Sequence, residues 1–430
     1  MPDALVTLET KTTKARIVLA VIVLSACAFA WFAVRWQLGE MLAEQTSVSD
    51  PNATELASVA VSLSPTNSLA LWFRAGVAND LFSPENIERS VNLYQNVVRH
   101  APFDFRWWGE LARAYEQAGR YDAAESSFKR AVELAPAYVY PRWQLGNFLL
   151  RQGRNDEAFA ELKRAADKAS IYRMPVYALA WEYFDHDPAR LENAMPGSAD
   201  ARAELAYFYS GRARQDDAVR MWNLLSEDEK KTNSIWAKNI GAVLFDNKYF
   251  RGAVEFTRQS GAEPDAQVET ITNGGFESPT DFAEQPRFSW RRGDNNARSE
   301  TATDGGIKHT GSRSLRITFK GFSSPEYNGI SQFVAVVPGS RYSLRFWVRT
   351  DGLKSAGPPV VAVSNARDGT ALATSTPFPT GSNEWQESEV NFAAPADSDA
   401  IQIRLARVSC GDNCPIAGTV WLDDFDLKRN

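Results

Sequence analysis

Catalysis and metal binding rely on residue types that are scarce in this sequence. Among its 430 residues there are three cysteines and three histidines. The histidines, His100, His186 and His309, lie in separate segments, and no G-x-S-x-G, H-E-x-x-H or Walker pattern occurs. Asp423 and Asp424 could form the paired carboxylates of a glycosidase, but neighbouring residues on a strand point to opposite faces. The sequence therefore predicts that the protein is not an enzyme.

A surplus of positive charge is also absent. The formal net charge is -6 at pH 7, whereas a nucleic-acid-binding protein needs a basic surface that displaces counterions from phosphates. Binding to nucleic acid is therefore not expected. With 44% hydrophobic and 23% charged residues, a chain of this length has the composition of two or three globular domains.

A long uncharged run lies near the N-terminus. Residues 17–34 read IVLAVIVLSACAFAWFAV, which is near the minimum length for a helix that crosses the hydrocarbon core. Trp31, Phe32 and Trp36 cluster at its far end, as in an interfacial aromatic belt. We therefore predict a transmembrane helix over residues 17–36.

The orientation of this helix follows from its flanking charges. Only Arg35 follows the run closely, whereas three basic residues precede it: Lys11, Lys14 and Arg16. By the positive-inside rule, residues 1–16 form a cytoplasmic tail, and the bulk of a single-pass inner-membrane protein lies in the periplasm or another extracytoplasmic space. A cleaved signal peptide is the alternative, because Ala26-Cys27-Ala28 offers small residues, but the run exceeds a usual signal core and lacks a clear A-x-A exit.

A helical repeat is predicted over residues 66–262, after a linker at 37–65. Eight residues fit the spacing W-x2-L-G-x2-Y-x8-A-x3-F-x2-A-x4-P: Trp108, Leu111, Ala112, Tyr115, Ala124, Phe128, Ala131 and Pro136. Further copies include a good one about 34 residues later and a degenerate one after it: Leu145, Gly146, Leu149, Ala158, Leu162 and Ala165, then Leu205, Ala206, Tyr209, Ala218, Trp222 and Leu225. This spacing resembles that of tetratricopeptide repeats, with weaker copies near Val77 and Ile240.

The resemblance implies an all-α solenoid that binds a protein partner. Small residues such as Ala112 and Ala124 let two antiparallel helices approach closely, and each pair needs a neighbour to bury its apolar face. Three prolines interrupt residues 171–200, where we expect a shortened helix pair: Pro175, Pro188 and Pro196. The signature residues are structural and do not identify the partner.

The last part of the chain, residues 268–430, has alternating strands between two short motifs. Asn273-Gly274-Gly275-Phe276-Glu277 opens this part, and Trp421-Leu422-Asp423-Asp424-Phe425 lies near its end. This bracket resembles that of jelly-roll carbohydrate-binding modules, which begin with N-x-G-F-E and end with W-x-D-D-F. The resemblance implies an all-β sandwich, so the chain is expected to be multidomain: a transmembrane helix, an all-α tetratricopeptide-like solenoid and an all-β jelly roll.

A saccharide cleft is the predicted site of the β domain. Polar and aromatic residues alternate with core residues on two strands, and those expected to face outward are Arg345, Trp347, Arg349, Gln402 and Arg404. Sugar rings stack on indole while guanidinium and amide groups bond hydroxyls or carboxylates. The alternative is that this face packs against a loop or the last helical repeat. Trp385 and Trp421 are expected to be core residues.

The resemblance also implies a structural calcium ion. Modules of this type often hold calcium between the acid of the first motif, here Glu277, backbone carbonyls of the loop before the Ser314-Leu315 strand, and the aspartate of the closing strand, here Asp424. Carboxylate and carbonyl oxygens are hard ligands that suit Ca²⁺. Alternatively, Glu277 caps a turn or pairs with an arginine.

Two of the cysteines are close in sequence. Cys410 and Cys414 flank Gly411-Asp412-Asn413, and a short-loop disulfide suits an oxidising compartment. Two free thiols are the alternative, and zinc is disfavoured because no further cysteine or histidine is near them in sequence.

Together these features predict a membrane-anchored extracytoplasmic scaffold that acts in envelope polysaccharide assembly or export. Its repeats would bind an envelope protein, and its β-sandwich would bind a polysaccharide. The alternative is a protein-interaction scaffold whose β-sandwich binds no sugar.

Overall fold

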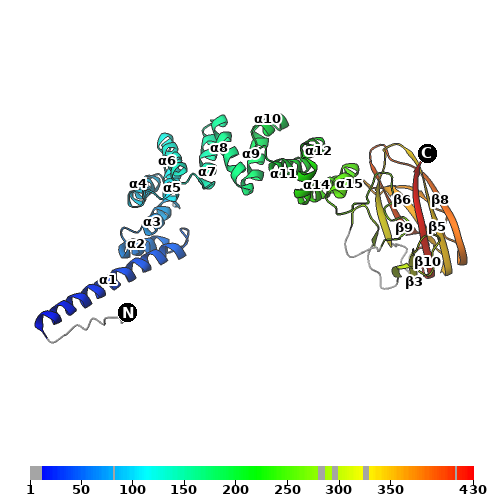
Figure 1. Cartoon of the computed structure of the whole chain (residues 1–430), viewed down its shortest axis with the longest axis horizontal. Coiled ribbons are helices and arrows are strands. Elements are labelled where there is room, and N and C mark those ends of the chain that lie inside the picture. Colours follow the sequence, from blue (N-terminus) through cyan, green and yellow to red (C-terminus); the bar gives the residue numbers. More distant parts are fainter. Residues whose placement is uncertain (1–11, 81–82, 279–285, 293–298, 323–328, 412–413) are drawn as a thin grey trace, which may run out of the picture. The chain divides into compact units, whose positions relative to one another are not determined.

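The computed structural model describes residues 12–80, 83–278, 286–292, 299–322, 329–411 and 414–430. The chain divides into two compact units, Met1–Pro196 and Gly197–Asn430. Most of the predicted cytoplasmic tail, residues 1–11, and Asp412-Asn413 of the cysteine loop lie outside the described residues. The fold class is confirmed, since helices occupy the N-terminal part and an antiparallel β-sandwich the C-terminal part (Figure 1).

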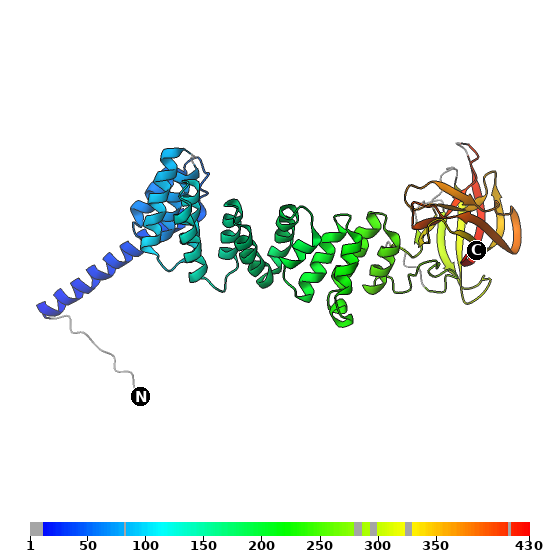
Figure 2. The same ribbon diagram turned by 90° about the horizontal axis from the view of Figure 1, so that it is seen from above.

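The first unit is helical. Its helices are α1 (Thr13–Gln45), α2 (Ala53–Leu63), α3 (Ser68–Asp80), α4 (Pro84–His100), α5 (Phe105–Gln117), α6 (Tyr121–Leu134), α7 (Tyr140–Arg151), α8 (Asn155–Lys168), η1 (Ser170–Tyr172), α9 (Arg173–Tyr183) and α10 (Pro188–Asn193). Helices that follow one another pack as antiparallel pairs, and the apolar part of α1 extends beyond α2 and α3 (Figure 2). α1 is long and apolar enough to span a membrane or to be a signal sequence.

The predicted linker at residues 37–65 is wrong, because most of it is helical. α1 continues to Gln45, and α2 packs against its last turns. Small side chains make this packing close: Ala43, Ala57 and Ala60 are almost fully buried, and a Cβ atom on Gly39 would lie 2.8 Å from the carbonyl oxygen of Ala60. A run of small residues lacks the large apolar side chains that mark helix pairs in a sequence.

The predicted repeat residues pack as the resemblance implies. Ala112, Ala124 and Phe128 are buried in one cluster between α5, α6, α7 and α8. Gly146 is needed where α7 meets α8, because a Cβ atom there would lie 2.7 Å from Cγ of Leu162. Trp108, by contrast, is only partly buried, and its indole N–H donates to the carbonyl of Pro102.

The proline-rich segment forms short helices, as predicted. η1 has three residues and α10 has six. Pro188 occupies the first turn of α10, where a missing N–H costs no hydrogen bond. Trp181 is buried among the helices, which favours a packing role over a ligand site for this aromatic residue.

The second unit contains the last helices and the sandwich. Its helices are α11 (Ala199–Ser210), α12 (Gln215–Asn223), α13 (Glu227–Thr232), α14 (Ser234–Asp246) and α15 (Phe250–Gln259). Its strands are β1 (Arg291–Arg292), β2 (Ser299–Asp304), β3 (Ser314–Phe322), β4 (Ile330–Ala335), β5 (Arg341–Ser355), β6 (Pro359–Asn365), β7 (Ala371–Thr374), β8 (Gly381–Ala393), β9 (Ala400–Arg407) and β10 (Ile416–Arg429). Sheet 1 has the order β1-β4-β9-β6-β7 and sheet 2 the order β2-β3-β10-β5-β8, with all neighbours antiparallel.

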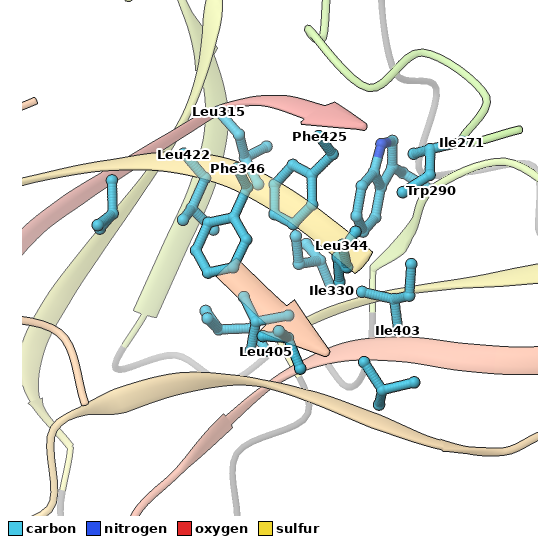
Figure 3. Packing of buried hydrophobic residues seen from close by; sticks show 14 of the residues in the cluster. Ile271, Trp290, Leu315, Ile330, Leu344, Phe346, Ile403, Leu405, Leu422 and Phe425 are labelled. Carbon is cyan, nitrogen blue, oxygen red and sulfur yellow. The ribbon is translucent and has the colours of Figure 1, made fainter. Parts of the chain in front are cut away.

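The inward residues of both sheets form one core. Leu315, Leu344, Phe346, Ile403 and Leu405 are among its members, and all are at most 1% exposed (Figure 3). The alternation predicted for β5 and β9 is therefore confirmed.

The two bracket motifs meet at one end of this core. Phe276, Trp290 and Phe425 contact one another with ring centroids 5.0 to 6.0 Å apart. The backbones of the two motifs are also in direct contact. The Phe425 N–H donates to the Gly274 carbonyl at 3.0 Å, and a Cβ atom on Gly274 would lie 2.2 Å from the Phe425 oxygen. Only glycine fits there, so the opening and closing motifs depend on each other.

The last helix pair packs on the outer face of sheet 1. Phe333 of β4 lies 5.2 Å from Phe245 of α14 and 5.9 Å from Phe250 of α15, measured between ring centroids. The carboxylate of Asp399 accepts hydrogen bonds from the backbone N–H groups of Phe250 and Arg251, which caps the first turn of α15. The second unit therefore combines the end of the repeats with the sandwich.

Candidate functional site

The five residues of the predicted saccharide cleft do not lie together. Arg345, Trp347 and Arg349 are on β5 in sheet 2, whereas Gln402 and Arg404 are on β9 in sheet 1. A single cleft built from all five is therefore wrong. Alternation along a strand shows which side chains face outward, but it does not show which strands are neighbours, and β5 pairs with β10 and β8 rather than with β9.

Trp347 is the centre of an aromatic group on the outer face of sheet 2. The imidazole of His309 stacks on its indole, with ring centroids 3.8 Å apart and an interplanar angle of 15°. Trp385 of β8 meets the same imidazole edge-on at 5.7 Å. We call Trp347, His309 and Trp385 the aromatic group. Trp385 is half-buried on this outer face, so its expected place in the core is wrong.

Charged side chains surround the aromatic group. Arg349 forms an ion pair with Glu384 at 2.8 Å, and Arg345 lies 3.6 Å from Glu389. Glu389 also accepts a hydrogen bond from the Ser343 hydroxyl at 2.6 Å, and this bond lowers the pKa of its carboxyl group. These pairs are largely exposed and add little stability. Their donors and acceptors are accessible to a polar ligand.

The other half of the predicted cleft faces the helices. Gln402 pairs with Phe333 and Arg404 with Ser331 across β9 and β4. Since Phe333 packs against α14 and α15, this part of sheet 1 lies beside the last repeat. The alternative prediction, in which the outward faces pack against a loop or the last repeat, describes sheet 1 at Phe333 and part of sheet 2, where the His309 loop covers one face of the Trp347 indole and leaves the residue half-exposed.

Three acids of the bracket motifs hold the loop that carries His309. Glu277 accepts hydrogen bonds from the Ser312 N–H and hydroxyl at 2.9 and 2.5 Å, and these bonds lower the pKa of its carboxyl group. Asp424 accepts from Nδ1 of His309 at 2.6 Å and from the Thr310 hydroxyl at 2.7 Å. Glu277 therefore fixes one end of the loop and Asp424 its tip.

Asp423 is the third acid, and it is fully buried. It accepts hydrogen bonds from the backbone N–H groups of His309 at 2.8 Å and Asp424 at 2.8 Å, yet burial raises the pKa of its carboxyl group. The expectation that Asp423 and Asp424 point to opposite faces is wrong here. β10 shifts register between Asp423 and Asp426, and Asp424 has a φ of 52°, so both carboxylates reach the same loop.

The side chains of both predicted calcium ligands approach Gly275. A Cβ atom on Gly275 would be 3.6 Å from Oδ1 of Asp424 and 3.7 Å from Cγ of Glu277. Carboxylate oxygens suit Ca²⁺, but these oxygens accept hydrogen bonds from the loop. No group of three or more acidic, histidine or cysteine side chains among the described residues has the geometry of a metal site. Calcium binding by Glu277 and Asp424 stays a prediction.

Calcium would raise the melting temperature of a fragment comprising residues 197–430, because a ligand that binds only the folded state stabilises it by about 2.7 kcal/mol at a hundredfold excess over Kd. Chelator would reverse the shift. Asp424→Ala should remove this response, whereas Asp426→Ala should keep it, since Asp426 is exposed and pairs with Lys428. Identical melting curves with calcium and with chelator would show that no ion is bound.

The cysteine pair forms a disulfide, as predicted. Cys410 is bonded to Cys414, with Cα atoms 5.5 Å apart. Arg407 supports the loop: its guanidinium donates to Sγ of Cys414 at 2.9 Å and to the carbonyl of Gly357 at 3.1 Å. The disulfide therefore lies in the connection between β9 and β10, and neither cysteine belongs to the aromatic group.

Comparison with known proteins supports the two domain types. Family models for tetratricopeptide repeats match residues 78–139 and 116–170, and a model for a carbohydrate binding domain matches residues 268–407. No curated protein matches the chain. The chain therefore carries tetratricopeptide repeats and a carbohydrate-binding domain, as their sequence motifs predict.

Solved structures resemble each part separately. One described as "CBM4 structure and function" shares 19% identity and covers 37% of this chain and 99% of its own, with a TM-score of 0.28. TmCBM61 in complex with beta-1,4-galactotriose shares 20% identity over 38% of this chain and 100% of its own, with a TM-score of 0.26. MamA 41-end from Desulfovibrio magneticus RS-1 shares 19% identity over 31% of this chain and 73% of its own, with a TM-score of 0.27.

Proposed function

We propose that the protein is a membrane-anchored scaffold in envelope polysaccharide assembly or export. The basis is that the chain carries both tetratricopeptide repeats and a carbohydrate-binding domain. Repeats of this class bind proteins, and domains of this class bind carbohydrates. The observation that carries the proposal is their combination with α1, whose most apolar 18 residues include none that is buried. An apolar helix surface of this length needs a hydrocarbon environment.

The bulk of the protein is proposed to lie outside the cytoplasm. Basic residues are concentrated before the apolar run, and the Cys410–Cys414 disulfide suits an oxidising compartment. Alkaline phosphatase fused to the C-terminus should therefore be active, while a reporter that works only in the cytoplasm should be silent. A fusion after residue 12 serves as the cytoplasmic control. The reverse pattern would refute the envelope location.

The polysaccharide is proposed to bind over the aromatic group on sheet 2. Phe333 on sheet 1 is covered by α14 and α15, whereas Trp347 and Trp385 are half-exposed and have charged neighbours. The imidazole of His309 holds the position over Trp347 that a stacked sugar ring would take, so the sugar replaces His309 on the indole. Arg345 and Arg349 would then bond its hydroxyl or carboxylate groups.

A second function is favoured by the same stacking. His309 is held by Asp424 at 2.6 Å and covers one face of the indole. If this arrangement is permanent, the sandwich is a structural end-domain of a protein-interaction scaffold and binds no sugar. A glycan-array screen of residues 197–430 distinguishes the two functions, because only the first yields a ligand whose binding depends on Trp347.

A further inference from the structure

The connections between consecutive repeats lie along one edge of the first unit. Helices α3 to α8 run alternately in opposite directions, so the connections at residues 64–67, 101–104, 135–139 and 169–172 occupy the same edge. Contacts link them in order: Trp72 meets Trp107 at 5.8 Å, Phe105 meets Tyr138 at 5.1 Å, and Nζ of Lys168 donates to the Pro136 carbonyl. We call these connections the inter-repeat edge.

Large apolar side chains are exposed along this edge. Phe103 is 80% exposed, Tyr138 62%, Tyr140 47% and Ile171 77%. Each of the three connections therefore exposes at least one large apolar side chain: Phe103 after α4, Tyr138 and Tyr140 after α6, and Ile171 after α8. An open depression lies between Phe103 and Tyr138. Repeated exposure of large apolar groups on one edge indicates a contact surface.

Two described turns of the opposite edge, after α5 and α7, have a different chemistry. They contain Gly119 and Gly153, both with positive φ. They are flanked by ion pairs that join neighbouring repeats, Arg120 with Glu88 and Arg154 with Glu125. Among the described residues of this edge, the exposed aromatic side chains are Tyr183 beside the Gly153 turn, at 44%, and Tyr121, at 50%, which serves as an internal comparison.

The apolar run of α1 ends at the inter-repeat edge. Nη2 of Arg35 donates to the carbonyl of Ser62 at 2.9 Å, and Nδ2 of Asn67 donates to Glu40 at 3.2 Å. The connection at residues 64–67 therefore lies beside the residues that follow the apolar run directly. If α1 crosses a membrane, this connection is at the membrane surface, and the inter-repeat edge begins there.

We propose that the inter-repeat edge lies on the membrane surface, with Phe103, Tyr138, Tyr140 and Ile171 in the interfacial layer of the lipid. This inference rests on the membrane anchoring of the proposed function. Aromatic side chains favour the membrane–water interface, and the α1 anchor keeps the edge at a high effective concentration near lipid, so weak individual contacts suffice.

The test uses the full chain, reconstituted at one copy per nanodisc of phosphatidylcholine and phosphatidylglycerol. In a Cys27→Ser background, single cysteines replace Phe103, Tyr138, Ile171 or, as the matched control, Tyr121, and each carries an environment-sensitive fluorophore. Probes at 103, 138 and 171 should show blue-shifted emission and loss of fluorescence with lipids that are spin-labelled near the headgroup. The probe at 121 should show neither change.

The outcomes separate this inference from the anchoring. If alkaline carbonate leaves the protein in the membrane but the edge probes behave like the probe at 121, the inference is wrong and the anchoring stands. If carbonate extracts the protein, the anchoring fails and the inference fails with it. A third outcome is that the emission of the edge probes shifts to the blue when the protein concentration is raised in detergent, while lipid has no effect on it. In that case a second copy of the chain covers the edge, and membrane contact is refuted.

Discussion

Replacing Gly274 with alanine is expected to destabilise the sandwich by about 3 kcal/mol. The added Cβ atom would lie 2.2 Å from the carbonyl oxygen of Phe425 and 3.2 Å from its carbonyl carbon. Both atoms belong to the backbone of the closing strand, so no side-chain rotation relieves the clash. The hydrogen bond from the Phe425 N–H to Gly274 and the contact of Phe425 with Trp290 would be disturbed together.

Denaturant unfolding of residues 197–430 measures this effect, and Gly305→Ala is the matched control. A Cβ atom on Gly305 has its nearest neighbour, the Ser312 carbonyl oxygen, at 3.7 Å, which is an ordinary contact. This substitution should change the free energy of unfolding by less than about 0.5 kcal/mol. Equal stability of the two variants would show that the two motifs do not constrain each other as the structure indicates.

The repeats and the two bracket motifs were predictable because their signals are local and periodic. Ala112, Ala124 and Phe128 occupy spaced positions that only close helix packing explains, and they are buried together. The bracket is similarly informative, since Gly274 and Phe425 are constrained by each other. In such cases the residue type at a given position is enough to predict the contact that it makes.

The composition of the candidate site was less predictable, because it depends on strand order and on one irregular strand. The alternation of Arg345, Trp347 and Arg349 correctly placed them on an outward face, but nothing local shows that β9 belongs to the other sheet. His309 was not predicted as a neighbour of Trp347. Its ring is held over the indole by a hydrogen bond to Asp424, a residue whose φ of 52° departs from regular strand geometry.

Packing between segments that are distant in sequence was also not predicted, because it leaves no local pattern. Residues 37–65 were predicted to be a linker because their buried face consists of small side chains, such as Ala57 and Ala60. The capping of α15 by Asp399 joins residues that are far apart in sequence. A lone aspartate in a turn carries no signal of the helix that it caps.

Substituting Trp347 with alanine is expected to remove most of the polysaccharide binding by the sandwich. The indole is the surface on which the sugar ring stacks, so its loss removes the main apolar contact. Because Trp347 is half-buried and paired with His309, the variant should also lose about 1 to 2 kcal/mol of stability. A fully buried aromatic residue would lose about 3 to 5 kcal/mol, so the unfolding free energy checks the exposure of the indole.

Two further variants locate the ligand. Arg345→Ala should weaken binding of acidic polymers most and make the remaining binding less sensitive to salt, because it removes a charge-assisted bond. Gln402→Ala is the matched control on sheet 1 and should leave affinity unchanged. If Gln402→Ala weakens binding and Trp347→Ala does not, the ligand lies on sheet 1.

The effect of His309→Ala depends on whether the sugar takes the place of the imidazole. In the structure the two rings are parallel at 3.8 Å, so one face of the indole is already occupied. A sugar that stacks there must displace His309 and break its 2.6 Å hydrogen bond to Asp424. Removing the imidazole abolishes this cost, and affinity measured on the fragment 197–430 should therefore rise in His309→Ala and fall in Trp347→Ala. Weaker binding in both folded variants would instead mean that the imidazole is part of the contact surface and that the sugar does not replace it.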